Sequence, residues 1–425
     1  MKPPKITINH DTKSRFSWCL YDWANSAFPT VIVTFVFSTY FVTNVAQDEV
    51  TGTAQWSVAV SISGLIIALL SPFLGAISDK MGQRKIWLGL FSLITIFSAG
   101  VLWFVRPEVD YVILALLAFS VANIGFEVGQ VFYNALLPAI APRQLTGRLS
   151  GWGWGMGYGG GLCCLLVSLF VFVQGSPPPL GLDAESAEHV RVVGPLVALW
   201  FTIFSLPLFV FVRDPIQVNV PLYDALRAGT RSLLNTIRNI REYRQIAWFF
   251  LARLLYVDGM NTMFVFGGIY AAGTFGMGIA EVMEFGVALN VSAGLGALVF
   301  AWLDDKLGAR NIVLLALSGL VALGIPLLII ESKLWFWIVG LLLGLFMGPA
   351  QSASRSLMVH LAPVGLQTEM FGLYALSGKA TAFLGPLILG FVTLATGSQR
   401  IGMVTVLVLI AGGLVVVLWK VRLSE

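Results

Sequence analysis

The chain has 425 residues, of which 57% are hydrophobic and only 11% are charged. Soluble domains carry roughly 25% charged residues, so a soluble protein of this length would lack the charges to cover its surface. The formal net charge of +4 comes from Lys and Arg in short stretches between apolar segments, which excludes a nucleic-acid-binding patch. Composition therefore predicts an all-α integral membrane protein.

Twelve segments are long enough to cross about 30 Å of hydrocarbon as helices of about 20 residues. They cover residues 17–45, 56–78, 86–105, 111–138, 147–174, 190–212, 246–275, 281–303, 311–330, 334–361, 367–396 and 400–420. The first apolar run is longer than the core of a signal peptide and is expected to remain as the first span. Lys and Arg concentrate in the termini and in the loops on the same side, which predicts cytoplasmic termini.

The longest loop divides the chain into an N-terminal six-helix bundle (1–212), a linker (213–245) and a C-terminal six-helix bundle (246–425). The linker predicts an amphipathic helix that carries Arg227, Arg231, Arg238, Arg241 and Arg244. Such a helix either binds a partner or lies against anionic lipid, and the arginine content favours lipid.

Four pairs of patterns recur in the two bundles, in the same order and at nearly one separation. GAISDKMGQRK, which begins at Gly75, is echoed by AWLDDKLGARN, and the D-x-x-N-S pattern at Asp22 is echoed by D-x-x-N-T at Asp258. Gln130 and Gly151 are echoed in the same way by Gln351 and Gly372. The two bundles are therefore predicted to be pseudo-symmetric repeats.

This organisation resembles the major facilitator superfamily, whose signature loop has the form G-x-x-x-D-[RK]-x-G-x-[RK]-[RK]. The first-bundle matches are Gly75, Asp79, Lys80, Gly82, Arg84 and Lys85, and the second bundle retains Asp305, Lys306 and Arg310. The resemblance implies that this loop braces the cytoplasmic gate. The carboxylate of Asp79 is expected to meet the N-terminus of a neighbouring helix.

Other segments resemble the vacuolar-effluxer branch of that superfamily. They are YDWANSAF (21–28), FYNALLP (132–138), GRLSGWGWGMGYGGG (147–161), LARLLYVDGMNT (251–262), SRSLMVHLAP (from residue 354) and FGLYALSGKATAFLGP (to residue 386). The fungal member of this branch exports amino acids from the vacuole, so the resemblance implies amino-acid efflux. Ala139 departs from the pattern, because an acidic residue is expected after Pro138.

No cofactor, nucleotide or metal site is expected. GMGYGG (155–160) lies inside a span with no strand before it, and GLYALSGKAT (372–381) has the wrong glycine spacing and Ala380 where a phosphate-binding loop needs Ser or Thr. The three cysteines and three histidines match no metal-ligand spacing. An ion or solute gradient is therefore expected to supply the energy.

Six ionisable residues remain well inside the spans: Asp22, Glu127, Arg253, Asp258, Arg355 and Lys379. Each costs roughly 2.5–3.5 kcal/mol at mid-helix, so such side chains normally face a polar interior and find partners. We expect Asp22 to face a water-filled cavity and Lys379 to pair with Asp258, whereas Arg253 and Asp258 lie on different helix faces. A purely structural polar contact is the alternative for Asp22 and Glu127.

The candidate cavity residues lie on the spans that show polar stripes. They are Asp22, Asn25, Glu127, Gln130, Asn134, Asp258, Asn261, Gln351, Arg355 and Lys379. Arg355 and Lys379 are candidates to bind a carboxylate, and the acidic residues to bind an amine or a proton. Glu127 is the first choice as the proton-coupling group, because its own helix supplies amides but no cation. Trp152, Trp154 and Tyr158 are expected to pack between helices rather than to stack on substrate.

The predicted function is secondary active transport of a small polar or zwitterionic solute by alternating access, with a coupling proton. A non-transporting sensor or scaffold on the same frame, and a facilitator for an unrelated small metabolite, remain alternatives; an enzyme is not expected. The partners are the solute, membrane lipids and the proton, and the chain is expected to be a monomer. The predicted location is a bacterial inner membrane, or a vacuolar membrane in a eukaryote.

Overall fold

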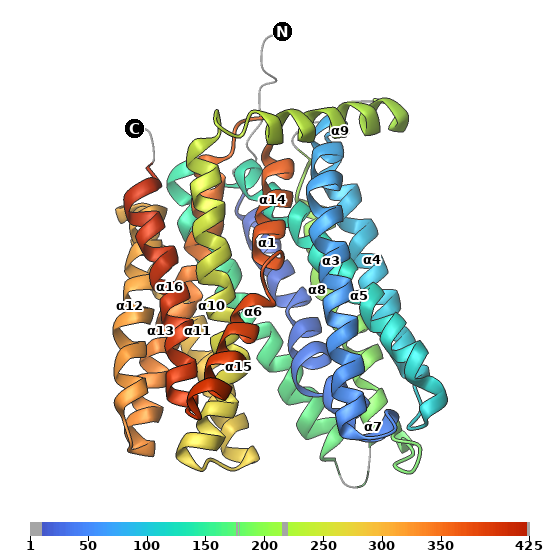
Figure 1. Ribbon diagram of the computed structural model, residues 1–425. Helices are drawn as coiled ribbons and strands as arrows, with labels where there is room; N and C mark the ends of the chain where they lie inside the picture. The colour runs from blue at the N-terminus through green and yellow to red at the C-terminus, as the bar shows by residue number, and fades with distance from the viewer. Residues whose placement is uncertain (1–10, 176, 178, 215–219, 423–425) are drawn as a thin grey trace.

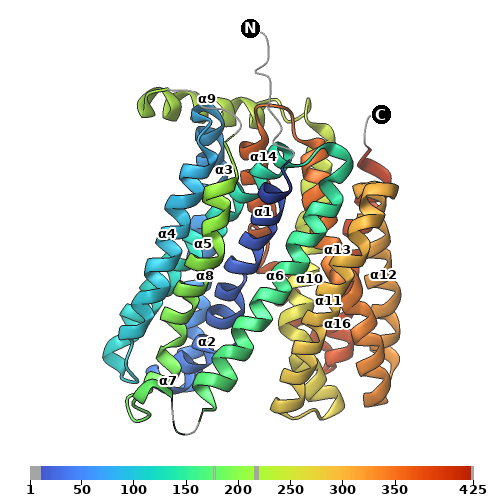
Figure 2. The ribbon, with the colours of Figure 1, turned by 180° about the vertical axis from the view of Figure 1, so that it is seen from behind.

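The computed structural model describes residues 11–175, 177, 179–214 and 220–422. Within these residues, twelve helical segments are long and apolar enough to cross a membrane, which confirms the predicted number. They form two bundles side by side (Figures 1 and 2). The first span begins at Thr12 and the last ends at Lys420, both at the end of the molecule that we call the termini face. The other end is called the opposite face.

The first bundle contains six spans, and the first of them is not a regular α-helix. The first span consists of α1 (Thr12–Asn25), η1 (Phe28–Phe35), α2 (Phe37–Tyr40) and η2 (Phe41–Val45), the second is α3 (Glu49–Met81), and the third is α4 (Arg84–Val101) with η3 (Leu102–Phe104). The fourth span is η4 (Val109–Tyr111) with α5 (Val112–Ile140), and the fifth is η5 (Arg143–Leu145) with α6 (Thr146–Leu166) and η6 (Val167–Val173). The short helix η7 (Pro179–Gly181) precedes the sixth span, which is α7 (Glu188–Arg191) with α8 (Val193–Phe211). Pro29 lacks the N–H that would continue the ladder of α1, and the chain widens into π-helix from Phe28.

The second bundle contains the other six spans, and one of them is broken. Its helices are α10 (Arg244–Phe275), α11 (Ile279–Leu307), α12 (Ala309–Ile329), α13 (Lys333–Leu361), α14 (Gln367–Lys379), α15 (Leu384–Thr396) and α16 (Gln399–Lys420). The continuous helix expected over 367–396 is wrong, because it is interrupted between Lys379 and Leu384. Pro386 lies in the first turn of α15, and in a continuous helix its ring would clash with the carbonyl of Ala382, one turn earlier.

Equivalent spans join the two bundles in the same way, which confirms the pseudo-symmetry. In one contact α3 packs on α14, and in the other α11 packs on α6. A Cβ atom at Gly372 would collide with the backbone of Ser71, and one at Gly151 would collide with the backbone of Ala297. The residues that echo one another in sequence thus make the same close approach.

The linker forms α9 (Leu222–Arg238), which lies across the termini face roughly perpendicular to the spans (Figure 1). It packs on α3, where a Cβ atom at Gly229 would meet the backbone of Ile77. The helix is shorter than expected: Arg241 lies beyond its end and Arg244 begins α10. The domain boundaries proposed at the two ends of the linker stay a prediction.

Candidate functional site

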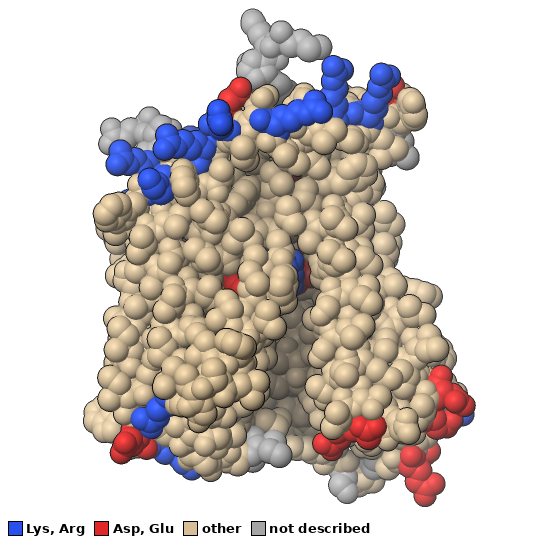
Figure 3. Space-filling model, in the orientation of Figure 1, with Lys and Arg blue, Asp and Glu red and all other residues tan. Residues whose placement is uncertain are grey.

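A cavity of about 1220 Å³ lies between the two bundles. Its walls come from parts of η1, α3, α5, α10, α11, α12, α13, α15 and α16 and from the end of α14. Figure 3 shows the hollow running from the opposite face to about mid-height, where charged side chains are visible inside it. The protein is therefore open at the opposite face and closed at the termini face.

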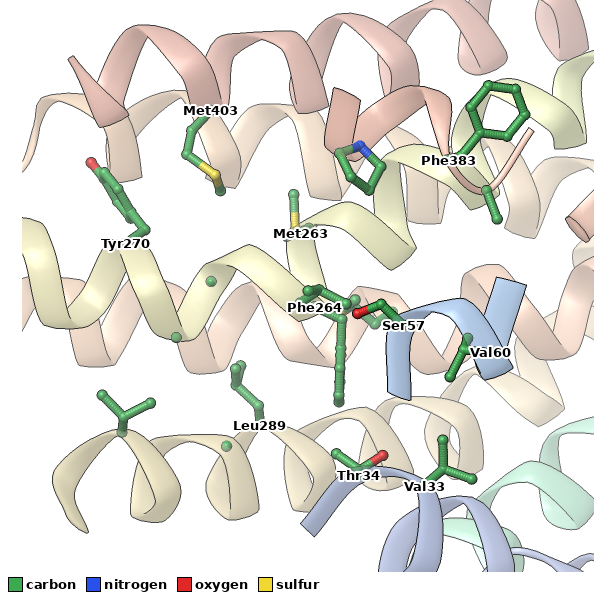
Figure 4. Close-up of a pocket in the computed structure, with 18 of the residues that line it drawn as sticks. Val33, Thr34, Ser57, Val60, Met263, Phe264, Tyr270, Leu289, Phe383 and Met403 are labelled. Atoms are coloured by element: carbon green, nitrogen blue, oxygen red, sulfur yellow. The ribbon is translucent and has the colours of Figure 1, made fainter. Parts of the chain in front are cut away.

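Most side chains that line the cavity are apolar. Figure 4 shows Val33, Thr34, Ser57 and Val60 from the first bundle with Met263, Phe264, Tyr270, Leu289, Phe383 and Met403 from the second. Lys379 also lines the cavity and is the one candidate site residue to do so among the residues that the structure describes. A solute in this space would therefore meet few polar groups, and Lys379 is the charged one.

Lys379 forms an ion pair with Glu127 from the other bundle. The distance from Lys379 Nζ to Glu127 Oε1 is 2.7 Å, and the two side chains are 33% and 24% exposed. The pairing of Lys379 with Asp258 predicted from the sequence is therefore wrong. The helix of Glu127 supplies no cation, as predicted, but the other bundle supplies one in Lys379. Lys379 ends α14 at the break in its span, and from there its side chain reaches α5.

Asp258 instead caps the second half of the broken span. Its Oδ2 atom accepts a hydrogen bond from the backbone N–H of Gly385, at 2.9 Å, near the N-terminus of α15. A carboxylate at this position is favoured by the helix dipole. Arg253 does not pair with Asp258, as expected: it donates to the Tyr374 carbonyl and to Ser377 Oγ.

Asp22 and Arg355 form a second ion pair between the bundles, and it is buried. Arg355 Nη1 lies 3.1 Å from Asp22 Oδ2, and the side chains of the two residues are 3% and 9% exposed. Arg355 also donates to Ser150 Oγ, to the Ser150 carbonyl and to Asn134 Oδ1. Its guanidinium lies over the ring of Trp18, with 4.8 Å from Cζ to the ring centroid.

The expectation that Asp22 faces a water-filled cavity is therefore wrong. The structure buries its carboxylate between the bundles, where Arg355 from α13 compensates its charge. Arg355 belongs to the second bundle, so separating the bundles here would expose both charges at once. The pair closes the contact between the bundles and does not line the cavity.

The other predicted cavity residues are dispersed. Gln351 accepts a hydrogen bond from Tyr158, and Asn25 is buried. Gln130 is half-buried and Asn261 is exposed, and neither is among the described residues that line the cavity. Their polar stripes follow the helices, but only part of each stripe points to the interior.

The termini face is closed by a lock that centres on Asp79. Its two carboxylate oxygens accept backbone N–H groups from Thr368, at 3.1 Å, and Glu369, at 2.8 Å. These groups belong to the first turn of α14, so Asp79 meets a helix N-terminus of the other bundle as expected. Arg84 Nη2 lies 3.0 Å from the same carboxylate and also donates to Gln367.

Two glycines make this arrangement possible. Gly82 ends α3 with a φ of +68°, in the left-handed region that a side chain disfavours. Gly75 lies where a Cβ atom would collide with the backbone of Thr368. Both glycines of the signature loop therefore serve backbone geometry rather than chemistry.

A second lock repeats the first with the bundles exchanged. Asp305 of α11 accepts the backbone N–H of Arg148, at 2.9 Å, in the first turn of α6. The Arg148 guanidinium lies 3.1 Å from the same carboxylate. Each bundle therefore supplies one aspartate that caps the N-terminus of a helix in the other bundle.

The remaining basic residues of the two loops divide into caps and surface groups. Lys85 Nζ donates to the Phe209 and Val212 carbonyls at the end of α8, and Arg310 donates to the Leu418 and Val421 carbonyls at the end of α16. Cations at a helix C-terminus are favoured by the dipole. Lys80 is half-buried and Lys306 is exposed.

Sequence reasoning missed Arg148 and Glu369. Both lie in the first turn of a span next to the aspartate of a lock. Their sequence signal was their position: each follows a loop of the termini face and precedes an echoed glycine, Gly151 or Gly372.

Comparisons with known proteins agree with this fold. The profile of the family described as "Vacuole effluxer Atg22 like" matches residues 42–424. The chain is 27% identical over 408 residues to the uncharacterized MFS-type transporter YxiO of Bacillus subtilis, covering 95% of this chain and 94% of that one. It is 21% identical over 397 residues to autophagy-related protein 22 of Saccharomyces cerevisiae, covering 81% and 71% of the two chains.

Among solved structures, the major facilitator transporter FucP in its outward conformation matches with a TM-score of 0.77 and 12% identity, covering 96% of this chain and 98% of that one. At this identity the match shows the fold alone. The branch predicted from YDWANSAF and its companion segments is confirmed by the family profile. The chain therefore belongs to the vacuole effluxer Atg22-like family of major facilitator transporters, which are multi-pass integral membrane proteins and not enzymes.

Proposed function

We propose that this protein exports a small zwitterionic solute, with an amino acid as the favoured substrate, in exchange for protons. The observation that carries the proposal is the Glu127–Lys379 ion pair. It joins the two bundles, its two side chains remain partly exposed, and Lys379 lines the cavity.

A zwitterion matches this pair chemically. Its carboxylate can take the place of Glu127 beside Lys379, and its ammonium group can take the place of Lys379 beside Glu127. Both protein charges keep a partner of opposite sign, so neither is left uncompensated in a partly dehydrated site. The apolar walls supply few competing polar contacts, so the two charged groups would fix the orientation of the solute.

The same geometry favours exchange over co-transport. A proton and a substrate ammonium group compete for one carboxylate, that of Glu127. A proton that binds from the more acidic side weakens the hold on the ammonium group, and substrate that binds from the other side displaces the proton. Under an inward proton gradient this competition drives export.

The orientation of the protein belongs to the same proposal. Lys and Arg gather at the termini face, and Asp and Glu gather at the opposite face (Figure 3). The positive-inside rule then places the termini in the cytoplasm, and the cavity would open outward. Alternating access would require the two aspartate locks and the Asp22–Arg355 pair to separate while the opposite face closes.

Proteoliposomes test the proposal. A panel of radiolabelled amino acids is loaded inside, and efflux is followed with and without a pH gradient, using a member of the panel that the wild type exports. Glu127→Gln should abolish acceleration of efflux by the gradient. It should also raise the KM of substrate exchange, because the same carboxylate binds the ammonium group, while exchange at saturating substrate persists because it needs no net proton movement. Glu284→Gln, which changes an exposed carboxylate, is the matched control and should behave as wild type.

Two results would contradict the proposal. Glu127→Gln with wild-type pH-driven efflux would leave Glu127 as a structural group. A flat trace for the wild type across the amino-acid panel would reject amino-acid export, and one that stays flat across a broad solute panel would favour the sensor or scaffold alternative.

A further inference from the structure

The linker helix α9 holds a buried carboxylate of the gate. Glu369 is fully buried in the first turn of α14, and its side chain accepts hydrogen bonds from Ser232 Oγ, at 2.9 Å, and from Thr236 Oγ1. The backbone N–H of the same residue donates to Asp79 in the first lock. A buried carboxylate needs such donors, so α9 supports the lock directly.

The same helix also packs on the other bundle. Gly229 lies so close to Ile77 of α3 that a Cβ atom would meet its backbone. α9 therefore bridges α3 and α14, the two helices that the Asp79 lock joins. When these helices separate, α9 cannot keep both its packing on α3 and its hydrogen bonds to Glu369. Whatever fixes α9 in place therefore favours the closed lock.

The free surface of α9 has the pattern of an interfacial helix. Arg227, Arg231 and Arg238 are exposed and share one side of the helix at i, i+4 and i+11. Beside them is an exposed apolar row, in which Tyr223, Leu226, Leu234 and Ile237 are 75%, 37%, 48% and 53% exposed. The helix lies at the termini face, where Lys and Arg gather (Figures 1 and 3).

We propose that anionic phospholipid headgroups bind the exposed arginine row of α9 and thereby hold the termini face closed. A row of cations next to exposed apolar side chains, at the level of the headgroups, complements an anionic bilayer surface. Lipid that binds this surface favours the state in which α9 is docked, and so favours the locked state. This proposal rests on the proposed function in one respect: the protein must have a second state in which the termini face is open.

The test measures opening of the lock and not transport. Ser352 is buried on α13, and its carbonyl accepts a hydrogen bond from Ser150 Oγ across the bundles. Ser352→Cys is introduced after the free cysteines Cys19, Cys163 and Cys164 are replaced. Its labelling by a neutral maleimide is compared in nanodiscs of phosphatidylcholine with and without phosphatidylglycerol. Labelling should be at least about fivefold slower with the anionic lipid.

Two variants separate lipid binding from its coupling to the gate. R227Q/R231Q/R238Q removes the arginine row, and S232A/T236A keeps the row but removes the hydrogen bonds to Glu369. Both should label at a rate that no longer depends on the lipid. The matched control R143Q/K306Q/R422Q removes three exposed cations outside α9 and should respond to lipid as the parent does.

Three results would overturn the proposal. One is a parent protein whose labelling ignores the anionic lipid, which would mean that this surface serves another partner or none. The others are an undiminished lipid response in the α9 arginine variant and an undiminished response in the hydroxyl variant. None of these depends on transport, so each stays distinguishable from a failure of the proposed amino-acid export.

Discussion

The replacement Asp79→Asn should unlock the termini face without unfolding the protein. The carboxylate accepts two backbone N–H groups of α14 and one N–H group of Arg84. An asparagine has one acceptor oxygen, and its NH₂ group would face a backbone donor. The variant therefore loses a charge-assisted hydrogen bond of about 1.5–3 kcal/mol and the attraction between a negative charge and the helix N-terminus.

Because these contacts join the two bundles, the loss falls mainly on the closed state of the termini face. A difference of about 2 kcal/mol changes the ratio of the two states roughly 30-fold. Labelling of Ser352→Cys, in the background without other cysteines, should rise by a similar factor when opening and closing are fast compared with the labelling reaction. The melting temperature should change little if the open state is as well packed as the closed one.

Asp110→Asn is the matched control, because Asp110 is an exposed carboxylate near the opposite face. It should leave labelling unchanged. If Asp79→Asn also leaves both labelling and transport unchanged, the carboxylate does not brace the gate, and the reasoning from its hydrogen bonds is refuted.

Three further changes test other contacts. Asp22→Asn leaves the buried Arg355 without its counter-charge and should cost about 3–5 kcal/mol, seen as a lower melting temperature in detergent; an unchanged value would show that the charge is compensated elsewhere. Gly82→Ala should cost about 1–2 kcal/mol because φ is +68°, whereas Gly64→Ala, in open space on the same helix, should not destabilise the protein; equal melting temperatures would contradict this. Lys85→Met should lower the melting temperature by removing the cation that caps α8, and addition of salt should narrow the difference from wild type.

The spans and the first lock could be predicted because their determinants are local. Apolar runs of about 20 residues define spans, and a motif fixed the position of Asp79 at the end of its helix. The motif also implies that Asp79 meets the N-terminus of a helix. It does not identify Glu369 as one of the residues whose backbone N–H donates to Asp79.

The ion pairs were predicted less well, because they depend on how two bundles are rotated against each other. Helical spacing placed Asp22 and Glu127 on polar faces, yet it contains no information on which residue of the other bundle lies opposite. The pairing of Lys379 with Asp258 rested on the expectation that their two spans are neighbours in the fold that the sequence resembles. The break before Pro386 instead gives Asp258 a helix N-terminus and leaves Lys379 to Glu127.

The reciprocal form of the two locks means that the gate needs no asymmetry between the bundles. Asp79 of the first bundle caps α14 of the second, and Asp305 of the second caps α6 of the first. Two copies of a single six-span chain, related by a two-fold axis, would form both contacts at once, because a symmetric interface repeats every contact that it makes. A homodimer of chains of half this length would therefore possess the same closable gate. The repeat is not exact elsewhere, because Asp22 pairs with Arg355 of the other bundle whereas Asp258 caps α15 of its own bundle.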